Sequence, residues 1–158
     1  MEPQRFLLAA WIRDCCAHKL SPRPRCVALF GSFCGGQLGP ESDIDLLLIG
    51  DQMPSRSYQR ALYLEPVRKA FSHEQANAFP NLPAIISPLF LTEKSWIDAV
   101  GLRLSASQQA WIVQDDGFLS ESLEEACKWI RTGEWTREDV TTGGWFWVPK
   151  QSKGGAVA

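Results

Sequence analysis

Two short apolar segments, residues 25–30 and 43–49, constrain the fold of this 158-residue chain more than any other feature. The first contains the β-branched Val27 and the aromatic Phe30 and leads directly into Gly31-Ser32. The second has the alternation of a β-strand, with Ile44, Leu46 and Leu48 on one face and Asp43, Asp45, Leu47 and Ile49 on the other. We therefore expect two strands of a sheet, one of which carries two acids on the same face.

The rest of the chain alternates between helix-like and strand-like segments. Helices are expected over residues 3–19, 55–73 and 93–104 and from Ser120 or Ser122 to Arg131, and further strands over residues 83–91, 110–113 and 145–148. Pro88 predicts that its strand is an edge strand or carries a bulge, because proline cannot donate a hydrogen bond to a sheet. The pattern predicts an α/β fold, a mixed β-sheet of about four to five strands with helices packed on it.

Length and composition exclude several classes of protein. Residues 1–150 are expected to form a single domain and residues 151–158 a flexible C-terminal tail. The net charge of −2 argues against a general nucleic-acid coat. No apolar run approaches the roughly 18–20 residues that cross a bilayer, and the first residues do not resemble a signal peptide, so a cytoplasmic protein is expected. The five cysteines form no Cys-x-x-Cys pair and are expected to be reduced thiols, while the seven tryptophans are expected mainly in the core.

The acids at Asp43 and Asp45 carry the main chemical signal. Two carboxylates at positions i and i+2 of a strand project from one face, with Cα atoms about 6.5–7 Å apart. They repel each other unless a cation or hydrogen bonds offset the charge. Oxygen ligands of this kind suit Mg²⁺, which also binds phosphate oxygens. Gly31 and Ser32 fit a tight turn whose N–H groups and hydroxyl meet a phosphate, so together these residues predict a site for a metal–nucleoside triphosphate.

The run Phe30-Gly31-Ser32, ten intervening residues, and Asp43-Ile44-Asp45-Leu46 resembles the signature of the polymerase-beta nucleotidyltransferase superfamily, in particular its small stand-alone bacterial members. The resemblance is strongest over residues 26–50 and implies a nucleotidyltransferase-like core. It implies that Gly31 and Ser32 contact the triphosphate and that Asp43 and Asp45 are the catalytic residues that ligate the divalent ions. It also implies a third acid on a later strand. Residues 83–91 contain none, with Ser87 at their middle, and Glu74 and Glu93 lie outside that strand.

The leading prediction is a nucleotidyltransferase that depends on Mg²⁺ or Mn²⁺ and moves an NMP group from an NTP, with ATP as the expected donor. The expected acceptor is a hydroxyl of a small molecule or protein, and nucleic acid and membranes are not expected as partners. An alternative is a catalytically weak or silent nucleotide-binding or antitoxin-like domain that acts through a protein, such as a helical toxin-like partner or a second copy of the chain. A third is an unrelated α/β binding module. Arg56 and Arg60 could steer phosphate or lie on a solvated helix face.

Overall fold

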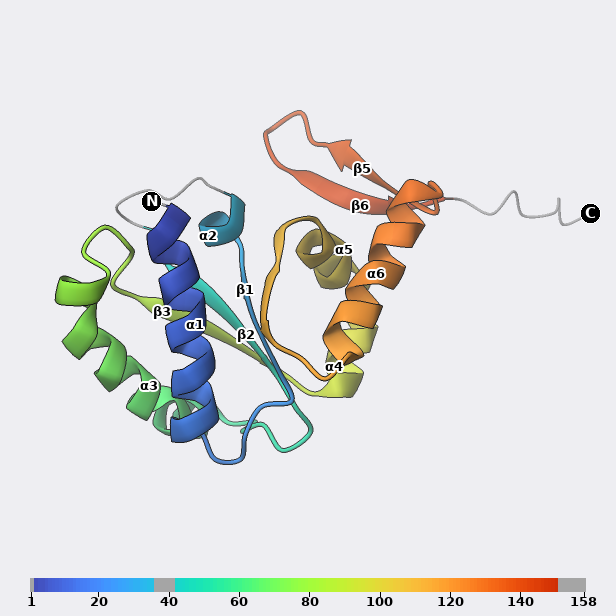
Figure 1. The fold of residues 1–158 in the computed structure, drawn as a ribbon. Helices are drawn as coiled ribbons and strands as arrows, with labels where there is room; N and C mark the ends of the chain where they lie inside the picture. Colours follow the sequence, from blue (N-terminus) through green and yellow to red (C-terminus); the bar gives the residue numbers. More distant parts are fainter. Residues whose placement is uncertain (1, 36–41, 151–158) are drawn as a thin grey trace, which may run out of the picture.

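The computed structural model describes residues 2–35 and 42–150, and these form a sheet with helices on both faces (Figure 1). In chain order the elements are α1 (Glu2–Lys19), β1 (Cys26–Phe30), α2 (Ser32–Gly35), β2 (Ile44–Ile49), α3 (Ser57–Ala78), β3 (Ile86–Leu91), α4 (Glu93–Asp98), α5 (Val100–Gln109), β4 (Trp111–Gln114), α6 (Phe118–Arg131), β5 (Trp135–Asp139) and β6 (Trp145–Pro149). The tail expected over residues 151–158 lies outside the described residues.

The main sheet has four strands in the order β3-β2-β1-β4. β1 is antiparallel to both of its neighbours, whereas β2 and β3 are parallel and are connected through α3. The predicted fold class, an α/β fold with a mixed sheet of about four to five strands, is confirmed by this four-stranded sheet. Within this register Asp45 is paired with Phe30 on β1 and with Ser87 on β3, so it lies in an inner strand of the sheet.

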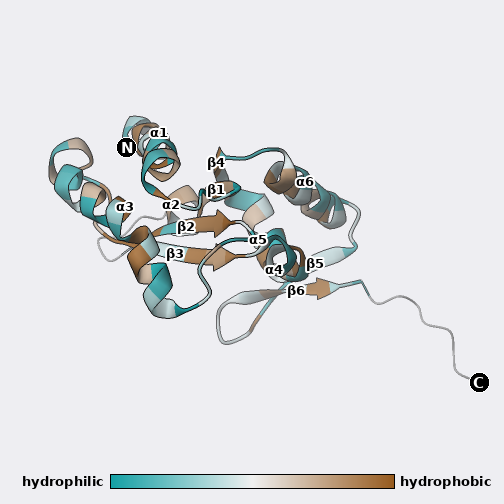
Figure 2. Cartoon of the chain, turned by 90° about the horizontal axis from the view of Figure 1, so that it is seen from below, coloured by the Kyte–Doolittle hydropathy of each residue, from teal (hydrophilic) through white to brown (hydrophobic). Residues whose placement is uncertain are grey.

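The two faces of the sheet contact different helices, as the alternation in β2 predicts. Ile44, Leu46 and Leu48 pack with buried side chains of α1 and α3. Leu47 and Ile49 pack on the other face with Trp96 of α4 and Leu119 of α6. Full burial of such a side chain contributes about 1.5–3 kcal/mol relative to exposure, so the hydrophobic run determines the position of β2. Figure 2 shows β2 and β3 as predominantly hydrophobic elements.

β3 is an edge strand, which confirms the expectation from Pro88. The N–H of Ile44 donates to the Ile85 carbonyl and that of Gly50 to the Leu91 carbonyl, so odd-numbered positions of β3 direct their backbone groups toward β2. Pro88 therefore directs its backbone outward, where it has no N–H to leave unpaired. The β2–β3 register runs without a shift, so the proline causes no bulge between these strands.

The C-terminal part differs from the sequence prediction in two ways. The helix expected over residues 93–104 is two helices, because the backbone at Ala99 leaves the helical region (φ −83°, ψ 61°) between α4 and α5. The strand expected at residues 145–148 exists, but it pairs with the unpredicted β5 in a separate two-stranded sheet. Trp147 holds this hairpin against α5 by donating its indole N–H to Ser105 at 3.0 Å. Among the described residues, no helix is long and apolar enough to cross a membrane.

Candidate functional site

Asp43 and Asp45 lie where the chain enters the main sheet. Asp45 is the second residue of β2, and Asp43 comes directly before the strand. By the alternation of the strand, the Asp45 side chain projects from the same face as Leu47 and Ile49, the face that is covered farther along by α4 and α6. Both aspartates are half-buried. The two acids therefore lie near the start of β2, in a partly solvated position beside β1 and β3.

Electrostatics at this position disfavour two negative charges. Burial raises the pKa of Asp45, and the charge of Asp43 raises it further. Among the described residues neither carboxylate forms an ion pair. A divalent cation would relieve this repulsion, and carboxylate oxygens are the donors that Mg²⁺ or Mn²⁺ prefers. The donor set fits a hard divalent ion whose remaining ligands are phosphate oxygens and water.

Gly31 brings the turn after β1 into contact with Asp45. Its φ of +68° lies in the left-handed region, which glycine adopts without steric cost. A Cβ built on Gly31 would lie 2.2 Å from Oδ2 of Asp45, far inside van der Waals contact. Glycine is thus required both by the turn and by the approach of the carboxylate, and the Gly-Ser turn lies directly beside Asp45.

The short helix α2 fixes this turn on the core. The Gly31 carbonyl accepts hydrogen bonds from the N–H groups of Cys34 and Gly35, both at 3.1 Å, and Phe33 is fully buried. The Arg5 guanidinium lies 5.5 Å from the centroid of the Phe33 ring. The half-buried Ser32 hydroxyl has no hydrogen-bond partner in the part of the chain that the structure describes. That hydroxyl is therefore available to a ligand at the start of α2.

The role of Arg5 in supporting the turn is missed from sequence. The pattern of α1 suggests that Arg5 faces water, but only 9% of it is exposed. The signal that places it correctly is the spacing of Leu8, Ile12 and Cys16, which together with Arg5 form one buried stripe. Phe6 and Leu7, whose helical spacing in the sequence suggests an apolar face, are instead 59% and 60% exposed.

A third acid is not found where the resemblance places it. Ser87 is the register partner of Asp45 on β3, so a hydroxyl and not a carboxylate lies beside Asp45 on that strand. Glu74 accepts a hydrogen bond from the Trp11 indole at 2.7 Å, and Glu93 pairs with Arg25 at 2.6 Å. In residues 2–35 and 42–150, Asp43 and Asp45 belong to no group of three metal-ligand side chains. The site is therefore a two-carboxylate site within the described residues.

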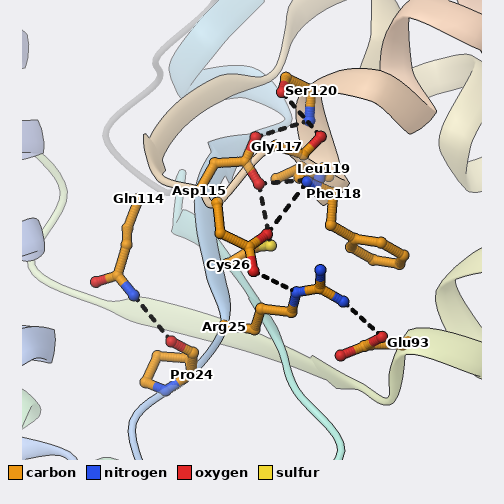
Figure 3. A network of polar contacts seen from close by, with 11 residues as sticks. Pro24, Arg25, Cys26, Glu93, Gln114, Asp115, Gly117, Phe118, Leu119 and Ser120 are labelled. Atoms are coloured by element: carbon orange, nitrogen blue, oxygen red, sulfur yellow. Dashed lines mark hydrogen bonds and ion pairs between the residues drawn. The ribbon is translucent and has the colours of Figure 1, made fainter.

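Another group of ligand-type side chains lies at the opposite end of β1, where Cys26, Asp115 and Asp116 approach within 4.8 Å (Figure 3). This grouping is compatible with a metal ion, but its donors are engaged. Burial, and then a hydrogen bond to Asp115, raises the pKa of Cys26 to about 12, so the sulfur is a neutral thiol. Asp115 accepts from the N–H groups of Leu119 and Ser120, both at 2.9 Å.

The contacts of Asp115 and Asp116 identify a helix start rather than a metal centre. Burial disfavours the charged form of Asp115, but hydrogen bonds from Ser120 and Leu119 outweigh burial and lower its pKa to about 2. Asp116 accepts from Arg25 at 2.6 Å and from the Phe118 N–H at 3.2 Å (Figure 3). Carboxylates at the first N–H groups of a helix satisfy donors that have no partner within the helix. The group therefore anchors α6 to β1.

Comparison with known proteins agrees with this geometry. Residues 10–79 match the family model of the nucleotidyltransferase domain, and this stretch contains Gly31, Ser32, Asp43 and Asp45. Residues 10–79 are therefore similar in sequence to a nucleotidyltransferase domain. No curated protein matches the sequence. A solved structure described as "Crystal structure of the toxin-antitoxin with AMP-PNP" is similar to this chain at 12% identity with a TM-score of 0.46, and the match covers 85% of this chain and 90% of that one.

Proposed function

We propose that this protein is a nucleotidyltransferase that depends on Mg²⁺ or Mn²⁺ and transfers an NMP group from an NTP, with ATP as the expected donor. The acceptor is the hydroxyl of a small molecule or protein, and residues 1–150 act as one domain. The observation that carries the proposal is the contact between the Gly31 turn and the Asp45 carboxylate. This contact supports the proposal because a turn of this kind can bind phosphate and an acid pair can bind a divalent cation.

The residues of the site have distinct roles in this proposal. Asp43 and Asp45 hold the divalent ion, and the turn at Gly31 and Ser32 positions the triphosphate. When bound, the ion neutralises charge on the phosphate oxygens. The acceptor oxygen forms a bond to the α-phosphorus, the bond to the β-phosphate oxygen breaks, and pyrophosphate leaves. The hydroxyl proton passes to solvent, because Ser87 beside Asp45 is no general base at neutral pH.

The hydroxyl of Ser87, which lies beside Asp45 in place of a third carboxylate, also favours a second candidate function. A site with two carboxylates can bind one metal ion together with the phosphates, but it activates a hydroxyl less well than a site with three. The second candidate is a nucleotide-binding domain with little or no transfer activity that acts through a protein partner. The two candidates share the same binding site and differ in the rate of transfer.

A transfer assay distinguishes the two functions. The purified protein is incubated with Mg²⁺ and ATP labelled at the α-phosphate, with whole-cell extract as the pool of acceptors, and labelled small molecules and proteins are then separated. We expect labelling that requires Mg²⁺ and is lost in Asp43→Asn. Asp51→Asn is the matched control, because Asp51 is an exposed residue in the turn after β2.

The outcomes separate the candidates. Labelling that survives in Asp43→Asn contradicts the assignment of the site. Absence of labelling, together with Mg²⁺-dependent binding of ATP, selects the second candidate. Absence of both contradicts both candidates and favours an unrelated binding module.

A further inference from the structure

The outer surface between α3 and the edge strand β3 contains three adjoining hollows. Their volumes are about 510, 220 and 170 Å³, and Arg68 lines all three. We call this surface the α3–β3 groove and define it by Tyr58, Arg60, Leu62, Arg68, Ile85 and Phe90. α3 packs on the face of the sheet that carries Leu46, whereas Asp45 projects from the other face. The groove is therefore separate from the candidate nucleotide site.

Large apolar side chains along this groove are exposed. Tyr58 is 59% exposed, Leu62 63% and Ile85 61%. Tyr58 and Leu62 are four residues apart and therefore lie on the same face of α3. The outward face of a solvated helix is normally polar, and contiguous exposed apolar groups mark interaction surfaces. The groove has the composition of a binding surface.

The charge of the groove selects an acidic occupant. Arg60 donates to the Pro54 carbonyl at 2.9 Å, and Arg68 donates to the Ile86 carbonyl at 3.2 Å. Both acceptors are neutral, and among the described residues neither guanidinium forms an ion pair. Glu65, the acid that lines the largest hollow, is paired with Lys69 at 2.8 Å. Two uncompensated positive charges therefore flank the apolar side chains.

The backbone of β3 argues against a strand as the occupant. Pro88 offers no outward N–H, and Arg68 already occupies the Ile86 carbonyl. Both features protect an edge strand from pairing with another strand. A helix needs no backbone partners and binds through side chains in a groove. The lining residues of α3 run from Ser57 to Ser72, and this span corresponds to about 22 Å, or roughly four helical turns.

We propose that the α3–β3 groove binds an amphipathic helix of a partner protein, about 15 residues long, with leucine-type side chains on one face and Asp or Glu beside them. The apolar side chains contact Tyr58, Leu62 and Ile85, and the carboxylates pair with Arg60 and Arg68. The helix binds on the face of the sheet away from Asp45, so the complex leaves the nucleotide site open.

The test uses two synthetic helical peptides of the same length. One carries leucine along one face with glutamate on both sides, and the other has lysine in place of every glutamate. Binding is measured by fluorescence anisotropy, and the site is mapped by amide NMR shifts of the full chain. We expect the glutamate peptide to bind at least tenfold more tightly, with shifts confined to α3, β3 and the adjoining residues Ala84 and Ile85. We also expect salt to weaken binding.

Variants assign this binding to the groove. Leu62→Asp places a charge on an exposed position and is expected to reduce the affinity at least tenfold without unfolding the protein. Arg60→Glu with Arg68→Glu is expected to reverse the preference between the peptides. Arg131→Glu, an exposed position at the end of α6, is the matched charge control and should bind like the unmodified protein.

Three results would overturn the proposal. The first is equal or no binding of the two peptides. The second is a set of NMR shifts outside α3, β3 and the two residues before β3, Ala84 and Ile85. The third is a dimer in analytical ultracentrifugation that Leu62→Asp converts to a monomer, because a second copy of the chain would then occupy the groove.

Discussion

Gly31 and Asp45 are in such close contact that a single Cβ on Gly31 would overlap the carboxylate, 2.2 Å from Oδ2. Thirteen residues separate them in the sequence, and the antiparallel pairing of β1 with β2, in which Phe30 is the partner of Asp45, brings them together. The nucleotide site proposed here depends on this contact, because it fixes the turn and the acid pair relative to each other.

Gly31→Ala should therefore impair both stability and nucleotide binding. The left-handed backbone costs an L-residue about 1–2 kcal/mol, and the new Cβ must displace the Asp45 carboxylate. Gly133→Ala is the matched control, because Gly133 has a similar φ of +71° and nothing within 4 Å of its Cβ position. Urea denaturation should show a loss for both variants. Titration with Mg²⁺ and an ATP analogue should show weaker binding for Gly31→Ala alone, and equal binding by the two would contradict the steric account.

Ser87→Asp should add the missing third carboxylate. Ser87 is the register partner of Asp45, so an aspartate there would add a third oxygen donor beside the acid pair. We expect transfer of labelled NMP to rise at least tenfold and the melting temperature without divalent ions to fall through added repulsion. Mg²⁺ should restore that temperature. Ser87→Asn, which has nearly the same shape without the charge, should show neither effect, and an equal response of both variants would refute the interpretation.

Asp115 should make the protein lose stability in acid. Its folded pKa of about 2 lies below the ordinary value of 3.8, so the folded state favours the charged form. Its contribution is therefore fully present above about pH 5 and is lost as the pH falls toward 2. Asp115→Asn should lower the free energy of unfolding by about 0.3–2 kcal/mol at pH 7, the range for a negative charge at a helix N-terminus. This deficit should shrink steadily between pH 5 and 2 in urea denaturation curves.

Glu124→Gln provides the control for that experiment, because Glu124 is an exposed acid on the same helix. It should change the free energy of unfolding little at any pH. A deficit of Asp115→Asn that stays constant down to pH 2 would show that the lost contribution is not electrostatic.

The sequence predicts β2 and its two faces because side chains alternate strictly between the two faces of a strand. Shifting the pairing of β2 by one residue would move its apolar side chains to the wrong face, so the apolar run determines the register. The Gly-Ser and Asp-x-Asp residues are recognised by their spacing. Their direct contact could not be derived in the same way, because it depends on the pairing of β1 with β2.

Tertiary contacts explain the features that sequence alone predicts wrongly. The sequence pattern suggests the wrong buried face for α1, because Arg5 is buried over Phe33, a residue of another helix. Phe6, on the face that the pattern favours, is 59% exposed. β5 was not expected because its residues after Trp135 are polar and exposed, and its partner β6 supplies the apolar side chains. The break at Ala99 has no glycine or proline at the break itself, and the nearby Gly101 lies inside α5.

The most direct test of the account is a calorimetric titration of the protein with a non-hydrolysable ATP analogue, with and without Mg²⁺. We predict saturable binding that requires Mg²⁺, with affinity reduced at least a hundredfold in Asp43→Asn and unchanged in Asp51→Asn. Binding that is indifferent to Mg²⁺, or that Asp43→Asn leaves intact, would contradict the claim that the acid pair beside Gly31 holds a metal–nucleotide.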